Sequence, residues 1–134
     1  PISQINNIKN GADWTTPEGD IVPNSWLVEP ADAPRSYAYC SDTCYLPDLY
    51  ERVKDVTVLY HESTYTSENE DRAKIYYHST ARQAALVAQK AGAGRLLLGH
   101  YSARYNNENV LLEEAKAVFP ESYLAQEGMV FEVK

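Results

Sequence analysis

Acidic and imidazole side chains follow three short apolar segments of this 134-residue sequence. They are Asp42 after residues 37–40, His61 and Glu62 after residues 56–60, and His100 after residues 95–99. Carboxylates and imidazoles are ligands for zinc or manganese, and a carboxylate can bridge two metal ions. A two-metal centre can activate water and hold both oxygens of an in-line displacement at phosphorus. These residue types therefore suit phosphodiester hydrolysis.

The number of ligands limits this interpretation. A zinc centre needs at least three protein ligands, and a two-zinc centre needs more. Asp42 and His100 are the clearest ligands, whereas His61 and His78 are weaker ones, and the sequence has no HxH or HxxEH cluster. Acyl transfer fits less well, because the sequence has no Gly-x-Ser-x-Gly nucleophile elbow. The sequence thus predicts half of a metal site, which would bind metal weakly.

Strands alternate with helices in the second half of the chain, which predicts an α/β fold with at least partly parallel pairing. The predicted strands are residues 36–40, 56–60 and 95–99, and the predicted helices are residues 46–54, 80–91 and 109–119. Thr80 and Gln83 form a capping box for the central helix, and Gly92 can end it. Ligands of such sheets bind beyond the carboxyl ends of the strands, so Asp42, Glu62 and His100 should converge there. His78 precedes the central helix, whose first backbone amides would receive a phosphate.

The two ends of the chain give weaker patterns. Residues 1–36 hold five of the seven prolines and suggest brief strands at residues 21–23 and 25–30. Residues 123–125 and 129–133, with a turn at residues 126–128, predict a closing strand pair. At this length we expect a single unit over residues 1–134.

Composition excludes several classes of protein. The chain has 12 basic and 19 acidic residues and a net charge of −7, so it is a poor generic nucleic-acid binder. No segment approaches the ~20 apolar residues of a membrane span, and the first residues lack the apolar part of a signal peptide. Cys40 and Cys44 are interpreted as reduced thiols, which favours a cytoplasmic location. Eleven tyrosines against two phenylalanines suit a wet cleft or an interface.

Four motifs in this order and spacing resemble ribonuclease Z, the tRNA 3′-end endonuclease family of the metallo-β-lactamase superfamily. They are Ser41-Asp42-Thr43, His61-Glu62-Ser63-Thr64, His78-Ser79-Thr80 and the seven residues from Gly99 to Tyr105. The ending from Phe119 to Val130 is similar to that family as well. The resemblance implies the C-terminal half of an αββα sandwich, with a mixed sheet and crossover helices. In the family the HxHxDH cluster lies in the N-terminal half, which would precede Pro1, so this chain would be inactive alone.

The resemblance also implies roles for individual residues. Asp42 would bridge both metals and His100 would ligate the second. His78 would contact the scissile phosphate and the leaving 3′ oxygen, with Glu62 orienting it. Arg104 would bind phosphate, and His61 would be structural. Ser63 replaces the usual alanine of the second motif, and Cys44 replaces a common basic residue, which leaves a phosphate contact from that position unsupported.

The implied activity is removal of the 3′ trailer from precursor tRNA by a homodimeric enzyme with two zinc ions, or manganese or another divalent metal, per complete site. One alternative is a small-molecule phosphodiesterase of the same superfamily. Another is a non-catalytic half-domain for dimerisation or RNA positioning. The presence of Asp42, Glu62, His78 and His100 argues against this last alternative for the parent protein.

Overall fold

The chain forms two compact units in the structure, a computed structural model that describes residues 1–134. The units are Pro1–Pro34 and Arg35–Lys134, where the sequence suggested one, and each is described by itself. The smaller unit contains η1 (Ile2–Gln4), α1 (Ile5–Lys9), the antiparallel pair β1 (Trp14–Thr15) and β2 (Ile21–Val22), and α2 (Asn24–Leu27). The strand predicted at residues 21–23 is thus confirmed as β2. The first part of the segment at residues 25–30 is helical instead and belongs to α2. The side-chain amide of Asn24 donates to the carbonyls of Ile8 and Ala12.

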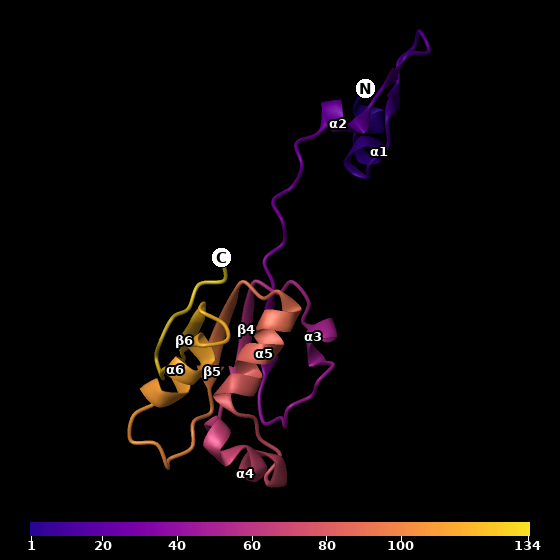
Figure 1. Ribbon diagram of the computed structural model, residues 1–134. Coiled ribbons are helices and arrows are strands. Elements are labelled where there is room, and N and C mark those ends of the chain that lie inside the picture. The colour runs from indigo at the N-terminus through magenta and orange to yellow at the C-terminus, as the bar shows by residue number, and fades with distance from the viewer. The chain divides into compact units, whose positions relative to one another are not determined.

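The larger unit is built on a parallel sheet with the strand order β3-β4-β5-β6 (Figure 1). Its strands are β3 (Tyr37–Cys40), β4 (Val58–Glu62), β5 (Arg95–Gly99) and β6 (Ser122–Leu124). Its helices are α3 (Leu49–Arg52), η2 (Ser67–Asn69), α4 (Glu70–Ile75), α5 (Ala81–Ala91) and α6 (Asn109–Lys116). Each pair of neighbouring strands is joined through a helix, as the alternating pattern predicts. The α/β class is confirmed.

Helix α5 has the boundaries that its sequence predicts. The Thr80 hydroxyl accepts a hydrogen bond from the Gln83 backbone, and the Gln83 side chain accepts one from the Thr80 backbone. This capping box satisfies two amides at the start of the helix. Gly92 ends it in the left-handed conformation, with a φ of 65°. The buried face of α5 is made mainly of alanines, which lets the helix approach the sheet closely.

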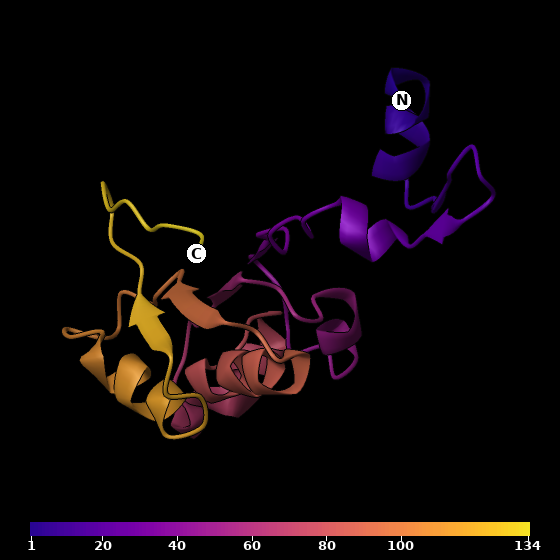
Figure 2. The ribbon, with the colours of Figure 1, turned by 90° about the horizontal axis from the view of Figure 1, so that it is seen from above.

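The two faces of the sheet differ in their side chains. Leu59, Leu96 and Leu98 point to the face covered by α5 and α6 and form the core with residues of those helices. Figure 2 shows both helices on that one side of the sheet. The opposite face carries a row of four paired residues, one from each strand: Tyr39, Tyr60, Leu97 and Tyr123. The Tyr39 and Tyr60 rings stack at 4.6 Å, and Tyr39 is 65% exposed. No helix of the larger unit covers this tyrosine row.

The closing strand pair predicted near the C-terminus does not form. Only β6 is a strand, and residues 125–134 contain none. The Arg95 guanidinium holds the last residues instead, since it donates to the carbonyls of Glu132 and Lys134 and lies over the Phe131 ring. None of the helices combines the length and the apolar character needed to cross a membrane.

Candidate metal centre

Asp42, His78 and His100 bring their ligand atoms within 4.8 Å of one another. Asp42 follows β3 and His100 follows β5, so both leave the carboxyl end of the sheet, and His78 lies in the loop before α5. Nε2 of His100 lies 3.2 Å from Oδ1 of Asp42, and the two imidazole rings are 5.1 Å apart. Glu62 ends β4 and contacts His78. The structure therefore brings together the four residues that the sequence predicts to converge, three after strand ends and His78 before α5.

The backbone is strained where the two strand ends turn into the site. Asp42 has a φ of 49° and His100 a φ of 58°, in the left-handed region that non-glycine residues seldom adopt. Tyr77, directly before His78, has a φ of 60°. Such conformations cost of order 1–3 kcal/mol each and concentrate at functional sites. Three of the four non-glycine residues with positive φ thus belong to this site or adjoin it.

Glu62 is completely buried and organises the site. Its Oε1 accepts from the Thr43 backbone at 2.9 Å and from Nδ1–H of His78 at 2.8 Å. Its Oε2 accepts from the Thr64 hydroxyl at 2.6 Å and from the Ser79 backbone at 3.0 Å. A buried carboxylate is tolerated when its oxygens are satisfied in this way. Because Nδ1 of His78 is engaged by Glu62, its Nε2 is left to act on a ligand or substrate.

His61 occupies the same strand but stays outside this cluster. It is fully buried, and its Nδ1–H donates to the Glu62 carbonyl at 2.8 Å. Burial lowers the pKa of this imidazole, although the carbonyl partner works in the opposite direction. Its Nε2 has no hydrogen-bond partner in the protein. The structural role that the resemblance implies for His61 agrees with this position.

The expectation that the start of α5 receives a phosphate is wrong, because its amides already have acceptors. Ala81 donates to the Tyr65 carbonyl, Arg82 to the Glu114 carboxylate, and Gln83 to the Thr80 hydroxyl. The Ala84 amide donates to the Thr80 carbonyl. A phosphate near His78 would have to bind side chains or a metal instead.

Arg104 and Cys44 lie at the margins of the site. The Arg104 guanidinium donates to the Asn69 side chain at 2.8 Å and makes no hydrogen bond or ion pair with Asp42, His78 or His100. Its phosphate-binding role stays a prediction. Cys44 is a free thiol beside the site and is not among the clustered ligand atoms.

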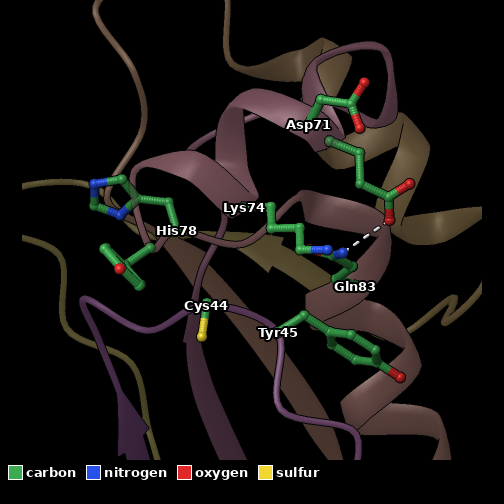
Figure 3. A pocket seen from close by; sticks show the side chains of 8 residues that line it. Cys44, Tyr45, Asp71, Lys74, His78 and Gln83 are labelled. Carbon is green, nitrogen blue, oxygen red and sulfur yellow. Dashed lines mark hydrogen bonds between the residues drawn. The ribbon is translucent and has the colours of Figure 1, made fainter.

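A pocket of about 700 Å³ adjoins His78 (Figure 3). The loop after β3 supplies Cys44 and Tyr45, α4 supplies Glu70, Asp71 and Lys74, and α5 supplies Gln83, with Tyr77 and His78 completing the wall. The Gln83 amide donates to Glu70 across the pocket at 2.8 Å, which Figure 3 marks. Volumes of this size hold small-molecule ligands in other proteins.

The donor set fits a divalent metal ion. A carboxylate and two imidazoles are typical zinc or manganese ligands. Two ligand atoms of one tetrahedral zinc ion lie about 3.3 Å apart, and the Asp42 and His100 atoms are already 3.2 Å apart. His78 gives the cluster a third donor. The residue types alone make His78 a weaker ligand than Asp42 and His100, whereas the resemblance to ribonuclease Z gives it a catalytic role instead.

Three residues that organise the site were not assigned roles from the sequence. They are Thr43 and Ser79, whose backbone amides bind Glu62, and Thr64, whose hydroxyl contacts both Glu62 and His100. All three lie inside the short motifs around Asp42, Glu62 and His78. Their position next to the acidic and imidazole residues is the one feature of the sequence that could have indicated these roles.

Comparison with known proteins shows which superfamily the chain resembles. Residues 9–101 match the β-lactamase superfamily domain. Ribonuclease Z of Bacteroides fragilis strain YCH46 is 49% identical over 129 residues, and that of Phocaeicola vulgatus is 47% identical over 134 residues. The match covers 96% of this chain and 42% of the first protein, and 100% of this chain and 43% of the second. The chain thus spans about two fifths of the length of these relatives.

Two solved structures share the fold. The metallo-β-lactamase fold protein YhfI from Bacillus subtilis has a TM-score of 0.65 and 27% identity, over 70% of this chain and 38% of its own. Human tRNase Z, short form, has a TM-score of 0.52 and 30% identity, over 71% of this chain and 31% of its own.

Proposed function

From the premise that this chain belongs to the metallo-β-lactamase superfamily, we propose that it is the part of a ribonuclease Z that holds the leaving group and completes a metal centre. The observation that carries this proposal is the cluster of Asp42, His78 and His100 around the buried carboxylate of Glu62. Similarity to ribonuclease Z proteins along nearly the whole chain supports it. The reaction is hydrolysis of precursor tRNA, which leaves a 3′-hydroxyl on the tRNA.

The roles divide between the two kinds of residue in the cluster. Asp42 and His100 would hold the metal, which we propose to be two zinc ions per complete site, with Asp42 as the carboxylate that they would share. Metal ions bound there would supply Lewis-acid chemistry and lower the pKa of water. As water adds to phosphorus, the bond from phosphorus to the 3′ oxygen breaks. His78, protonated at both ring nitrogens, would pass its Nε2 proton to that oxygen and keep the Nδ1–H that donates to Glu62. Glu62 keeps the His78 ring in place through the Nδ1–H bond of 2.8 Å.

The surroundings of His78 suit the nucleotide that leaves with the 3′-hydroxyl. The pocket beside His78 is lined by Tyr45, Tyr77 and Lys74 together with the acidic residues Glu70 and Asp71. Aromatic rings stack on nucleobases, and a cation can pair with a phosphate. Arg104 is proposed to bind phosphate once it leaves Asn69, because a guanidinium can hold two oxygens. The net charge of −7 requires that most of the basic surface for tRNA lie outside this chain.

The remaining proposals concern the complete protein. The tyrosine row on the open face of the sheet supports a second layer packed there, as in a complete αββα sandwich, for which residues 1–134 would supply one half. We propose that the complete protein is cytoplasmic, in line with the free thiols of Cys40 and Cys44. We also propose that it is a homodimer. Native mass spectrometry of the complete protein tests the dimer, and a monomer at micromolar concentration would contradict it.

The roles can be separated by measuring bound zinc and precursor tRNA cleavage in parallel in the full-length protein. Asp42→Ala should remove both metal and activity. His78→Ala should lower turnover by about 10²–10⁴-fold while the metal stays, which is the usual contribution of a positioned acid. Loss of zinc from His78→Ala as complete as that from Asp42→Ala would make His78 a ligand and overturn the assignment.

A second substrate distinguishes the proposed function from its alternatives. Wild-type protein that cleaves bis(p-nitrophenyl) phosphate but leaves precursor tRNA intact would favour a small-molecule phosphodiesterase. Protein that binds zinc and cleaves neither substrate would favour a non-catalytic role. Cleavage of precursor tRNA at the expected 3′ position supports the proposal.

A further inference from the structure

We propose that Thr64 is a positioning residue, which fixes the tautomer of His100 and links that imidazole to Glu62. The proposal rests on the proposed metal-binding role of His100 and deepens it. The Thr64 hydroxyl lies 2.6 Å from Oε2 of Glu62, 2.9 Å from Nδ1 of His100 and 3.0 Å from the His100 carbonyl. Thr64 is 6% exposed, so bulk water competes little for these contacts.

The hydroxyl has one hydrogen, and the distances indicate where it goes. A hydroxyl that donates to a carboxylate makes a short bond of about 2.5–2.7 Å, and the Thr64 contact to Glu62 falls in this range. The Thr64 oxygen, having given its hydrogen to Glu62, can only accept from the imidazole. Nδ1 of His100 must therefore carry the proton.

This assignment determines what the other ring nitrogen can do. With the proton on Nδ1, Nε2 of neutral His100 keeps its lone pair, and Nε2 is the atom 3.2 Å from Asp42. A lone pair and a carboxylate oxygen at that distance can both coordinate the same cation. Thr64 thus prepares Nε2 as a ligand atom, as hydrogen-bond partners do for metal-binding histidines generally.

Glu62 orients both imidazoles of the cluster through this arrangement. It binds His78 directly through Oε1 and reaches His100 through Oε2 and the Thr64 hydroxyl. The two rings lie 5.1 Å apart, one in direct contact with the carboxylate and the other connected to it through Thr64. Removal of the Thr64 hydroxyl should release His100 while the Glu62–His78 bond of 2.8 Å remains.

Histidine tautomers give a direct test that needs neither tRNA nor cleavage. Chains labelled with ¹⁵N at histidine would be compared by NMR without metal, as wild type, Thr64→Ser, Thr64→Val and the control Thr66→Val. Thr66 lies two residues away and its hydroxyl contacts Tyr105 instead of the site. We expect neutral His100 to be protonated at Nδ1 in wild type, Thr64→Ser and Thr66→Val. Thr64→Val should show a mixture of tautomers or the Nε2–H form.

Zinc titration against a chromophoric chelator supplies the second measurement. Thr64→Val should bind zinc about 10–100-fold more weakly than wild type, the usual effect of losing such a partner. Thr64→Ser and Thr66→Val should stay close to wild type. Wild-type His100 protonated at Nε2, or Thr64→Val with unchanged tautomer and zinc affinity, would overturn the proposal. If Thr64→Val does not fold, the tautomer in wild type and Thr64→Ser still decides it. Failure of tRNA cleavage with the tautomers as expected would contradict only the proposed function.

Discussion

Asp42 and His100 follow two different strands, both with a positive φ, and Oδ1 of Asp42 lies 3.2 Å from Nε2 of His100. The strands β3 and β5 both pair with β4, so the two residues reach over the end of β4 from either side. A residue in the usual extended conformation at either position would continue its strand away from the other. The strain at these two positions is therefore coupled to the formation of the site.

Replacing Asp42 with asparagine should weaken zinc binding of this chain at least tenfold. The amide has nearly the same shape and tolerates a φ of 49°, but it lacks the charge that attracts a cation. Competition with a chromophoric chelator measures the change. Asp55→Asn is the matched control, because Asp55 is exposed, has a φ of 55° and is not among the clustered ligand atoms. Equal losses in the two variants would contradict a ligand role for Asp42.

Replacing Glu62 with glutamine should lower the free energy of unfolding by about 2 kcal/mol or more. Each Glu62 oxygen accepts two hydrogen bonds, so an amide NH₂ at either position faces two donors. A buried donor left without an acceptor costs about 1–3 kcal/mol. Urea unfolding measures the loss. Glu70→Gln is the control, since Glu70 is exposed and accepts one bond from Gln83. Similar stability of the two variants would refute the organising role of Glu62.

Replacing Gly99 with alanine should destabilise the larger unit by about 1–3 kcal/mol, the usual cost of overpacking. A Cβ atom at Gly99 would overlap the phenol of Tyr60 on the neighbouring strand. To make room, the Tyr60 ring would have to shift and disturb its stack on Tyr39. Urea unfolding of the single variants and of the Gly99→Ala/Tyr60→Ala double variant forms a cycle. The alanine penalty should nearly vanish without the Tyr60 ring, and an unchanged penalty would show that the overlap is not its cause.

Acid should destabilise the larger unit partly through His61. Burial lowers the pKa of His61 in the folded chain, so the unfolded chain takes up the proton first as the pH falls. The stabilisation is complete above the unfolded pKa of about 6.5 and is lost as the pH falls below it, by at most about 1.4 kcal/mol per pH unit. His61→Asn keeps an N–H donor near the Glu62 carbonyl and cannot titrate. Its unfolding free energy should fall less steeply than that of wild type between pH 6.5 and 5. Parallel curves would mean that His61 titrates normally.

Elements with local signals are predicted best from the sequence. The capping box at Thr80 and the left-handed Gly92 define α5, and the apolar run Arg95–Gly99 is β5 over the same residues. Strand β4 was predicted two residues early, because residues 56–60 have the β-branched pattern. In the structure, the ladder between β4 and β5 continues to the pair of Glu62 and Gly99. Pairing with a neighbouring strand, which a single segment cannot reveal, sets its end.

Residue type and strand order were enough to predict which acidic and imidazole residues meet at the candidate site. The convergence of Asp42, Glu62 and His100 follows from parallel strands that share one edge. His78 reaches the same place from the loop before α5. The satisfied amides at the start of α5 could not be foreseen, since one acceptor, Glu114, comes from α6. The bridging position of Thr64 depends on the turn at His100, whose positive φ is uncommon for residues other than glycine and leaves no signal in the sequence.

The buried carboxylate of Glu62 also has a consequence for slow motions of the chain. Its two oxygens accept hydrogen bonds from the backbone amides of Thr43 and Ser79, which lie in two loops far apart in sequence. Neither loop can open fully without exposing part of a charge that the other loop helps to bury. In deuterated solvent, the amide hydrogens of Thr43 and Ser79 should therefore exchange at similar rates, through one shared opening event. Zinc should slow both together, because its proposed ligands Asp42 and His100 border the same carboxylate network.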